Sequence, residues 1–205
     1  MKSKLIKFLI VAAVMASLSM TAQAVPTTAA IQVSSGASTV TIQDNAGTDL
    51  SPSAGQIMWS GSINGWNLMV TVGDTKPILG SATSPQMDLT VTANTPGAAP
   101  LTVRFTDTGF GPTAGSIIST HFNNGTASET ASVLVDPLNA QFGGLPATSI
   151  NLASAPYSIT LVDTFTVGTI SADHRIITTV PDGGTTVLLL GAALSALGLI
   201  KRRLA

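Results

Sequence analysis

Apolar and polar residues alternate in short runs between residues 25 and 179, and Gly, Pro, Ser, Thr and Asn separate these runs. Alternation with a period of two gives a β-strand one apolar face and one polar face. The runs with this pattern are residues 39–43, 57–63, 66–72, 87–93, 101–105, 117–122, 130–135, 157–167 and 170–180. Because no stretch of this part keeps a 3.6-residue period, we expect strands and almost no helix.

The turn residues between the runs predict how the strands connect. Asn64-Gly65 joins two alternating runs directly, and Asn-Gly favours a two-residue hairpin turn because both central residues need a positive φ. We also expect hairpins at residues 123–125 and 168–169, and a turn at residues 107–109 that ends the strand 101–105. About nine closely spaced strands are typical of one β-sandwich, so the sequence predicts an all-β domain over residues 25–179.

The N-terminus has the three zones of a secretory signal peptide. Three lysines lie within the first seven residues, an apolar run covers residues 8–18, and Ala22-Gln23-Ala24 forms an A-x-A cleavage site. We expect signal peptidase to cleave after Ala24, so that residues 1–24 are removed.

The C-terminus is a second targeting segment, over residues 180–205. It consists of a polar motif at residues 180–186, an uncharged helix predicted at residues 185–200 and a basic end at Lys201, Arg202 and Arg203. Sixteen helical residues rise about 24 Å, slightly less than a hydrocarbon core of about 30 Å. The basic end would lie on the cytoplasmic side and would leave the rest of the chain outside.

The residues of this motif are Val180, Pro181, Asp182, Gly183 and Gly184. With the short span and the basic end, they resemble the PEP-CTERM class of bacterial sorting signals, in its Val-Pro-Asp-Ser-Gly variant. Gly183 stands where that variant usually has Ser. The resemblance implies sorting by an exosortase, a membrane-embedded cysteine transpeptidase-like enzyme, and removal of the helix. It also implies a host with an outer membrane and exopolysaccharide.

Charge and cysteine content exclude several classes of function and attachment. Residues 25–179 contain three basic and nine acidic residues, so this part has a net charge of −6 and no basic face for nucleic acid or anionic lipid. The chain has no Cys, which excludes disulfide bonds and a lipoprotein anchor.

Enzymatic motifs are absent from the sequence. The two histidines, His121 and His174, lie inside strand-like runs, and there is neither a G-x-S-x-G motif nor a phosphate-binding Gly-rich loop. We therefore expect no enzymatic activity, no cofactor and no metal site.

Two patterns leave a binding role open. Asp44 and Asp49 flank an Asn-Ala-Gly-Thr turn whose oxygens could bind Ca²⁺, although Asp, Asn and Gly also suit any turn. Trp59 and Trp66 flank the Asn-Gly turn and could stack on sugar rings, although Trp is more often half-buried. The pairs Thr39/Thr41 and Thr90/Thr92 are too few for an ice-binding face.

The sequence thus predicts a structural or adhesive protein that is exported across the inner membrane. It would be anchored transiently by its C-terminal helix and then released to the outer envelope or the extracellular matrix, where exopolysaccharide is a possible partner. The alternative is a carbohydrate- or calcium-dependent binding module.

Overall fold

The computed structural model describes residues 29–95, 97, 99–113, 116–147, 156–179 and 190. The strands in these residues are β1 (Ala30–Ser35), β2 (Ser38–Gln43), β3 (Gln56–Ile63), β4 (Trp66–Asp74), β5 (Gln86–Thr95), β6 (Leu101–Phe110), β7 (Ser116–Asn123), β8 (Glu129–Asp136), β9 (Leu145–Pro146), β10 (Tyr157–Phe165) and β11 (Ile170–Thr179). None of the elements described between residues 29 and 179 is an α-helix, which confirms the all-β prediction.

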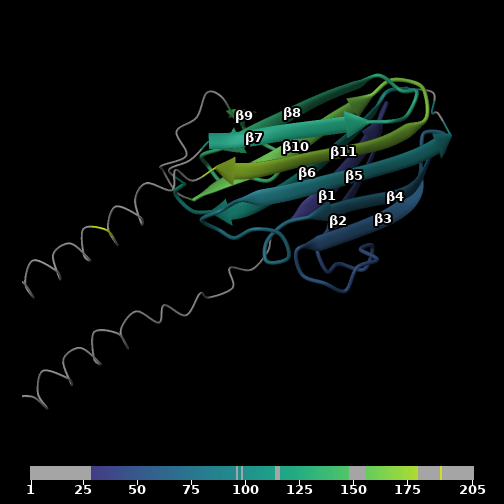
Figure 1. The fold of residues 1–205 in the computed structure, drawn as a ribbon. Helices are drawn as coiled ribbons and strands as arrows, with labels where there is room; N and C mark the ends of the chain where they lie inside the picture. The colour runs from purple at the N-terminus through teal and green to yellow at the C-terminus, as the bar shows by residue number, and fades with distance from the viewer. Residues whose placement is uncertain are drawn as a thin grey trace, which may run out of the picture.

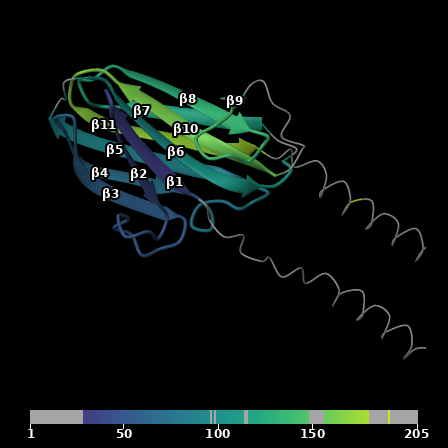
Figure 2. The same ribbon diagram turned by 180° about the vertical axis from the view of Figure 1, so that it is seen from behind.

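The strands form two antiparallel sheets. One sheet has six strands in the order β2-β1-β6-β10-β8-β9, and the other has five in the order β3-β4-β5-β11-β7. Figures 1 and 2 show these sheets as two layers from opposite sides. Two strands that follow one another in the chain often belong to different sheets, so the chain crosses between the layers several times.

One apolar core fills the space between the two sheets, because each strand turns its alternate residues inward. In β11, for example, alternate residues from Ile170 to Ile176, including His174, are buried, while Ser171, Asp173 and Arg175 between them are exposed. The largest buried side chains come from both sheets and are Trp66, Tyr157, Phe105, Phe110, Phe165, Ile31, Ile42, Ile57, Leu68, Met87, Leu89 and Leu101.

The hairpin predicted at Asn64-Gly65 is confirmed. β3 and β4 are antiparallel neighbours, with Ile63 opposite Trp66. Asn64 has φ 46° and Gly65 has φ 86°, the two positive values that this turn requires.

The other two predicted hairpins are wrong, because their turns pass from one sheet to the other. β7 pairs with β11 and β8 pairs with β10, so the turn at residues 123–125 joins the two layers. The turn at residues 168–169 does the same between β10 and β11. The backbone N–H of Ala127 donates to the carbonyl of Thr169 at 3.0 Å, which holds these two crossings together. Turn chemistry alone did not distinguish a crossing from a hairpin.

The turn predicted at residues 107–109 is also wrong, because β6 continues through it to Phe110. Asp107 is fully buried and Gly109 has φ 72° within the strand. The polar residue that suggested a turn instead has a buried partner, which is described below.

Several predicted segments lie outside the described residues. These are the signal peptide, the sorting motif at residues 180–186, and the basic end at residues 201–203. Of the helix predicted at residues 185–200, the structure describes Leu190 alone. A membrane-spanning helix is not found among the residues that the structure describes.

Candidate functional site

A buried lysine and a buried aspartate link the two sheets. Thr75 and Lys76 directly follow β4 in the five-stranded sheet, whereas Asp107 lies on β6 in the six-stranded sheet. Lys76 is 5% exposed and Asp107 is fully buried. A backbone hydrogen bond holds the segment that carries Lys76, because the N–H of Thr75 donates to the carbonyl of Gly55 at 2.7 Å.

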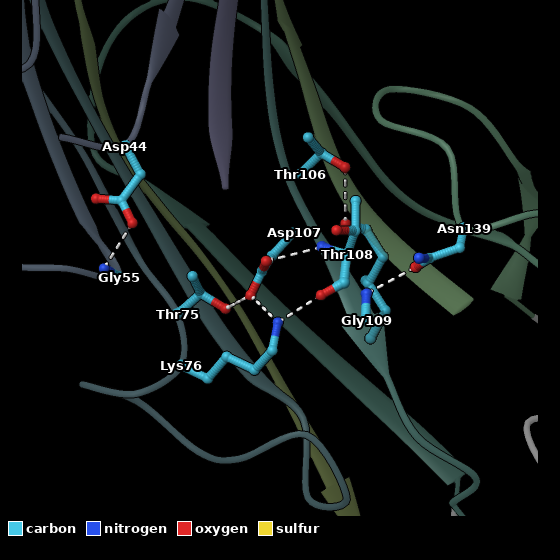
Figure 3. Close-up of polar contacts among 10 residues, drawn as sticks. Asp44, Gly55, Thr75, Lys76, Thr106, Asp107, Thr108, Gly109 and Asn139 are labelled. Carbon is cyan, nitrogen blue, oxygen red and sulfur yellow. Dashed lines mark hydrogen bonds and ion pairs between the residues drawn. The ribbon is translucent and has the colours of Figure 1, made fainter. Parts of the chain in front are cut away.

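Figure 3 shows that the polar groups of this site converge on the Asp107 carboxyl group. Lys76 Nζ lies 2.6 Å from Asp107 Oδ2 and also donates to the carbonyl of Thr108 at 2.5 Å. The Thr75 hydroxyl donates to the same Oδ2 at 2.8 Å. The backbone N–H of Thr108 donates to Oδ1 at 2.7 Å, so each carboxyl oxygen has its own donors.

An aromatic ring also contacts this pair. Lys76 Nζ lies 4.2 Å from the centre of the Phe110 ring, within the range of a cation–π contact. Burial raises the pKa of Asp107, and Lys76 opposes that shift by its charge and its hydrogen bond. A buried ion pair of this kind is costly to desolvate, and removing one partner leaves an uncompensated charge. We call Thr75, Lys76, Asp107 and Thr108 the Lys–Asp site.

A second polar cluster joins the sheets near β7 and β8. His174 on β11 is fully buried, and its Nδ1 lies 2.5 Å from Oδ1 of Asp163 on β10 of the other sheet. Its Nε2 lies 2.9 Å from the hydroxyl of Ser119 on β7. When Nδ1–H donates to Asp163, a neutral imidazole accepts the Ser119 hydroxyl at Nε2.

This order of hydroxyl, imidazole and carboxylate also occurs in serine nucleophiles, which are recognised by geometry and not by sequence position. Here, however, Ser119 lies in the middle of a strand and His174 has no exposed surface. A nucleophilic serine usually lies on a sharp turn that presents its hydroxyl group to a substrate. Ser119 is exposed on β7 while His174 and Asp163 are buried, so the cluster is a polar link that runs from the surface of β7 into the space between the sheets.

Glu129 on β8 adds a third charged group to this cluster. The pKa of Glu129 is raised to about 7, chiefly by burial and then by the charge of Asp163, while the charge of His174 opposes the shift. Both carboxyl oxygens of Glu129 and Oδ2 of Asp163 are buried without a hydrogen-bond partner among the described residues. A proton on Glu129 removes the repulsion between the two carboxylates, so this cluster responds to pH near neutrality.

The two sequence-predicted Ca²⁺ ligands are engaged in turn hydrogen bonds. Asp49 accepts the backbone N–H groups of Ser51 and Met58 at Oδ1 and that of Asn45 at Oδ2, each at 2.9 Å. Asp44 accepts the N–H of Gly55 at 2.9 Å. These oxygens fix the loop between β2 and β3, and no group of three metal-binding side chains is found in the part of the chain that the structure describes.

The two tryptophans do not share an outer surface. Trp66 is fully buried and its indole N–H donates to the carbonyl of Ala99 at 2.8 Å. Trp59 is partly buried and packs against the core. The paired stacking platform that the sequence suggested is therefore not formed, because one of its rings belongs to the core.

The two histidines of the chain are neighbours on adjacent strands. His121 and His174 are opposite one another on β7 and β11, with ring centres 6.3 Å apart. The carboxylate that contacts His174 is Asp163 on β10, whereas the adjacent Asp173 on β11 is exposed. The sequence did not indicate either cluster. Its one signal is that Lys76 is the only lysine in residues 25–179, which contain nine acidic residues.

Comparison with known proteins finds a match to the C-terminal segment of the chain. A family model described as the VPDSG-CTERM motif matches residues 179–204. No curated protein and no solved structure matches the chain. The chain therefore carries a PEP-CTERM-type sorting signal of the VPDSG variant at its C-terminus.

Proposed function

We propose that this chain is an exported structural or adhesive protein that an exosortase delivers to the outer envelope or the extracellular matrix. The match of the VPDSG-CTERM motif to residues 179–204 carries this proposal, because a motif of this type implies export and membrane-associated sorting. In this account the helix at residues 185–200 is a temporary anchor, and residues 25–179 are the part that remains outside.

The body supports a structural role in two ways. It places polar side chains on the outer faces of two sheets, such as the exposed Thr39 and Thr41 on β2. It also links its two sheets through buried polar contacts without any disulfide bond. We favour this role over a carbohydrate- or calcium-binding module, because Trp66 is buried and Asp49 is engaged in turn hydrogen bonds.

The proposal is tested by replacing the centre of the motif with Pro181→Ala and Asp182→Ala. We expect the variant to accumulate in the inner membrane as a longer, unprocessed form, because the processing enzyme recognises this segment. Fractionation followed by immunoblotting measures both changes. The matched control is Ser171→Ala, at an exposed position on β11 upstream of the motif, which should be processed normally. Normal processing and release of the double variant would refute the proposal.

A further inference from the structure

The Lys–Asp site has the composition and geometry of a cross-link that can form without an enzyme. We propose that Lys76 and Asp107 form an intramolecular amide (isopeptide) bond that joins the two sheets covalently. The proposal starts from the 2.6 Å contact between Lys76 Nζ and Asp107 Oδ2, which holds an amine against a carboxyl group in a buried site. It concerns the folded body alone, so it stands or falls independently of the sorting pathway.

The bond requires a neutral amine and a neutral carboxylic acid. Transfer of one proton from Lys76 to Asp107 along their contact produces both, and it does not change the net charge of the site. Because burial penalises charged forms, the neutral pair is favoured here more than it would be in water. The raised pKa of Asp107 is consistent with this direction.

The neighbouring groups match the steps of amide formation. Lys76 Nζ attacks the Asp107 carboxyl carbon, and negative charge develops on Oδ1, which already accepts the backbone N–H of Thr108. Oδ2 is the leaving oxygen, and it accepts the Thr75 hydroxyl at 2.8 Å. Nζ loses two protons overall: one is the proton already transferred to the carboxyl group, and the other reaches Oδ2 through the Thr75 hydroxyl. The bond between Lys76 Nζ and Asp107 Cγ forms, the bond between Asp107 Cγ and Oδ2 breaks, and Oδ2 leaves as one water molecule.

Folding supplies the driving force that such a condensation lacks in solution. The two groups are held in contact by the segment that follows β4 and by β6, which replaces a bimolecular encounter by an intramolecular one. Burial of Thr75, Lys76 and Asp107 also limits the access of water that would reverse the reaction. The product would span 31 residues of sequence and would provide the covalent link between sheets that a chain without Cys cannot make by a disulfide.

Intact-mass spectrometry of the purified, denatured full chain tests the proposal directly. We expect a mass about 18 Da below that of the unmodified chain, which is one water molecule. Trypsin then locates the bond. It does not cut the Lys76–Pro77 bond, so Lys76 lies in the peptide that ends at Arg104 and Asp107 lies in the peptide from Phe105 to Arg175. These two peptides should remain joined after complete digestion.

The matched variant is Lys76→Arg, which keeps the cation but has no amine that forms this amide. It should show the full mass and two separate tryptic peptides. Asp163→Asn, which alters the other buried cluster, should keep the loss of water and the joined peptides. A wild-type chain that is folded but has its full mass would overturn the proposal. A loss of water that persists in Lys76→Arg would also overturn it, because the loss would then come from another site.

Discussion

His174 Nδ1 and Asp163 Oδ1 lie 2.5 Å apart across the interface between the two sheets, and both side chains are fully buried. β11 carries the histidine and β10 carries the aspartate, and the chain between them is the short crossing at residues 166–169. This contact and the Lys–Asp site tie the layers together at two separate places. Both contacts join charged or ionisable side chains that are buried between the sheets, so their loss should be measurable.

Removal of the imidazole should destabilise the body strongly. His174→Ala leaves the buried Asp163 without its partner, and removing one member of a buried pair costs about 3–5 kcal/mol. Urea denaturation measures this loss. The control is Thr120→Ala, an exposed position on the neighbouring strand, which should cost less than about 0.5 kcal/mol. Equal stability of the wild type and His174→Ala would show that the pair does not hold the sheets together.

Stability should depend on pH through Glu129. Its pKa is about 7 in the folded protein, against 4.5 for an unperturbed glutamate side chain. Between these values the folded state holds a proton that the unfolded state has lost, so the free energy of unfolding falls as pH rises. Thermal melts from about pH 5 to pH 8 should therefore show a decreasing Tm for the wild type.

The control for this effect is Glu129→Gln, which keeps the shape of the side chain and cannot ionise. The variant should lose part of the pH dependence and be more stable than the wild type at pH 8, on the order of 1 kcal/mol because Glu129 is partly exposed. Asp88 and Asp107 also have a raised pKa, so the difference between the two proteins is the decisive quantity. Parallel curves for both proteins would contradict this role of Glu129.

Close packing of the sheets should make Gly73 sensitive to substitution. A Cβ at this position on β4 would lie 2.8 Å from the ring of Phe105 on the opposite sheet. Gly73→Ala should therefore cost about 1–3 kcal/mol through overpacking. Gly47→Ala is the control, because a Cβ there would meet nothing within 4 Å. A Gly73 variant as stable as the Gly47 variant in urea would mean that the sheets are less tightly packed at this point.

Ser119 should not behave as an activated nucleophile. Its hydroxyl contacts His174, but it lies mid-strand beside a fully buried imidazole. We expect no covalent labelling of the folded protein by a fluorophosphonate, as measured by mass spectrometry. Labelling that is lost in Ser119→Ala and retained in a control variant at the exposed Ser132 would contradict the expectation of a body without enzymatic activity.

Local sequence patterns predicted the strands well, because alternation is a property of each strand alone. Nine of the strands follow runs that alternate in sequence, and the Asn64-Gly65 hairpin follows from the backbone that its turn needs. The strand β1 was missed, although Ile31 and Val33 alternate within it, because the small residues at its ends give a weak signal. The partners of strands were not predictable in the same way. Turns rich in Asn and Gly join β7 to β8 across the layers, just as they join β3 to β4 within one.

The polar clusters between the sheets could not be predicted from sequence patterns, for a related reason. Lys76 and Asp107 are 31 residues apart, and Asp163 and Ser119 meet through His174 from three different strands. Their contacts depend on which faces of which sheets are opposed, which a single sequence does not state. The sorting motif was predictable because Val180 to Arg203 form one contiguous segment, and the match to residues 179–204 confirms it.

The C-terminal residue of the mature protein outside the cell tests the central claim most directly. In this account residues 180–205 are a removable sorting signal, so mass spectrometry of the protein recovered outside the cell should find a C-terminus at or near residues 180–186. The basic residues Lys201, Arg202 and Arg203 should be absent from that protein. Recovery of extracellular protein that still ends in Leu204-Ala205 would contradict the account.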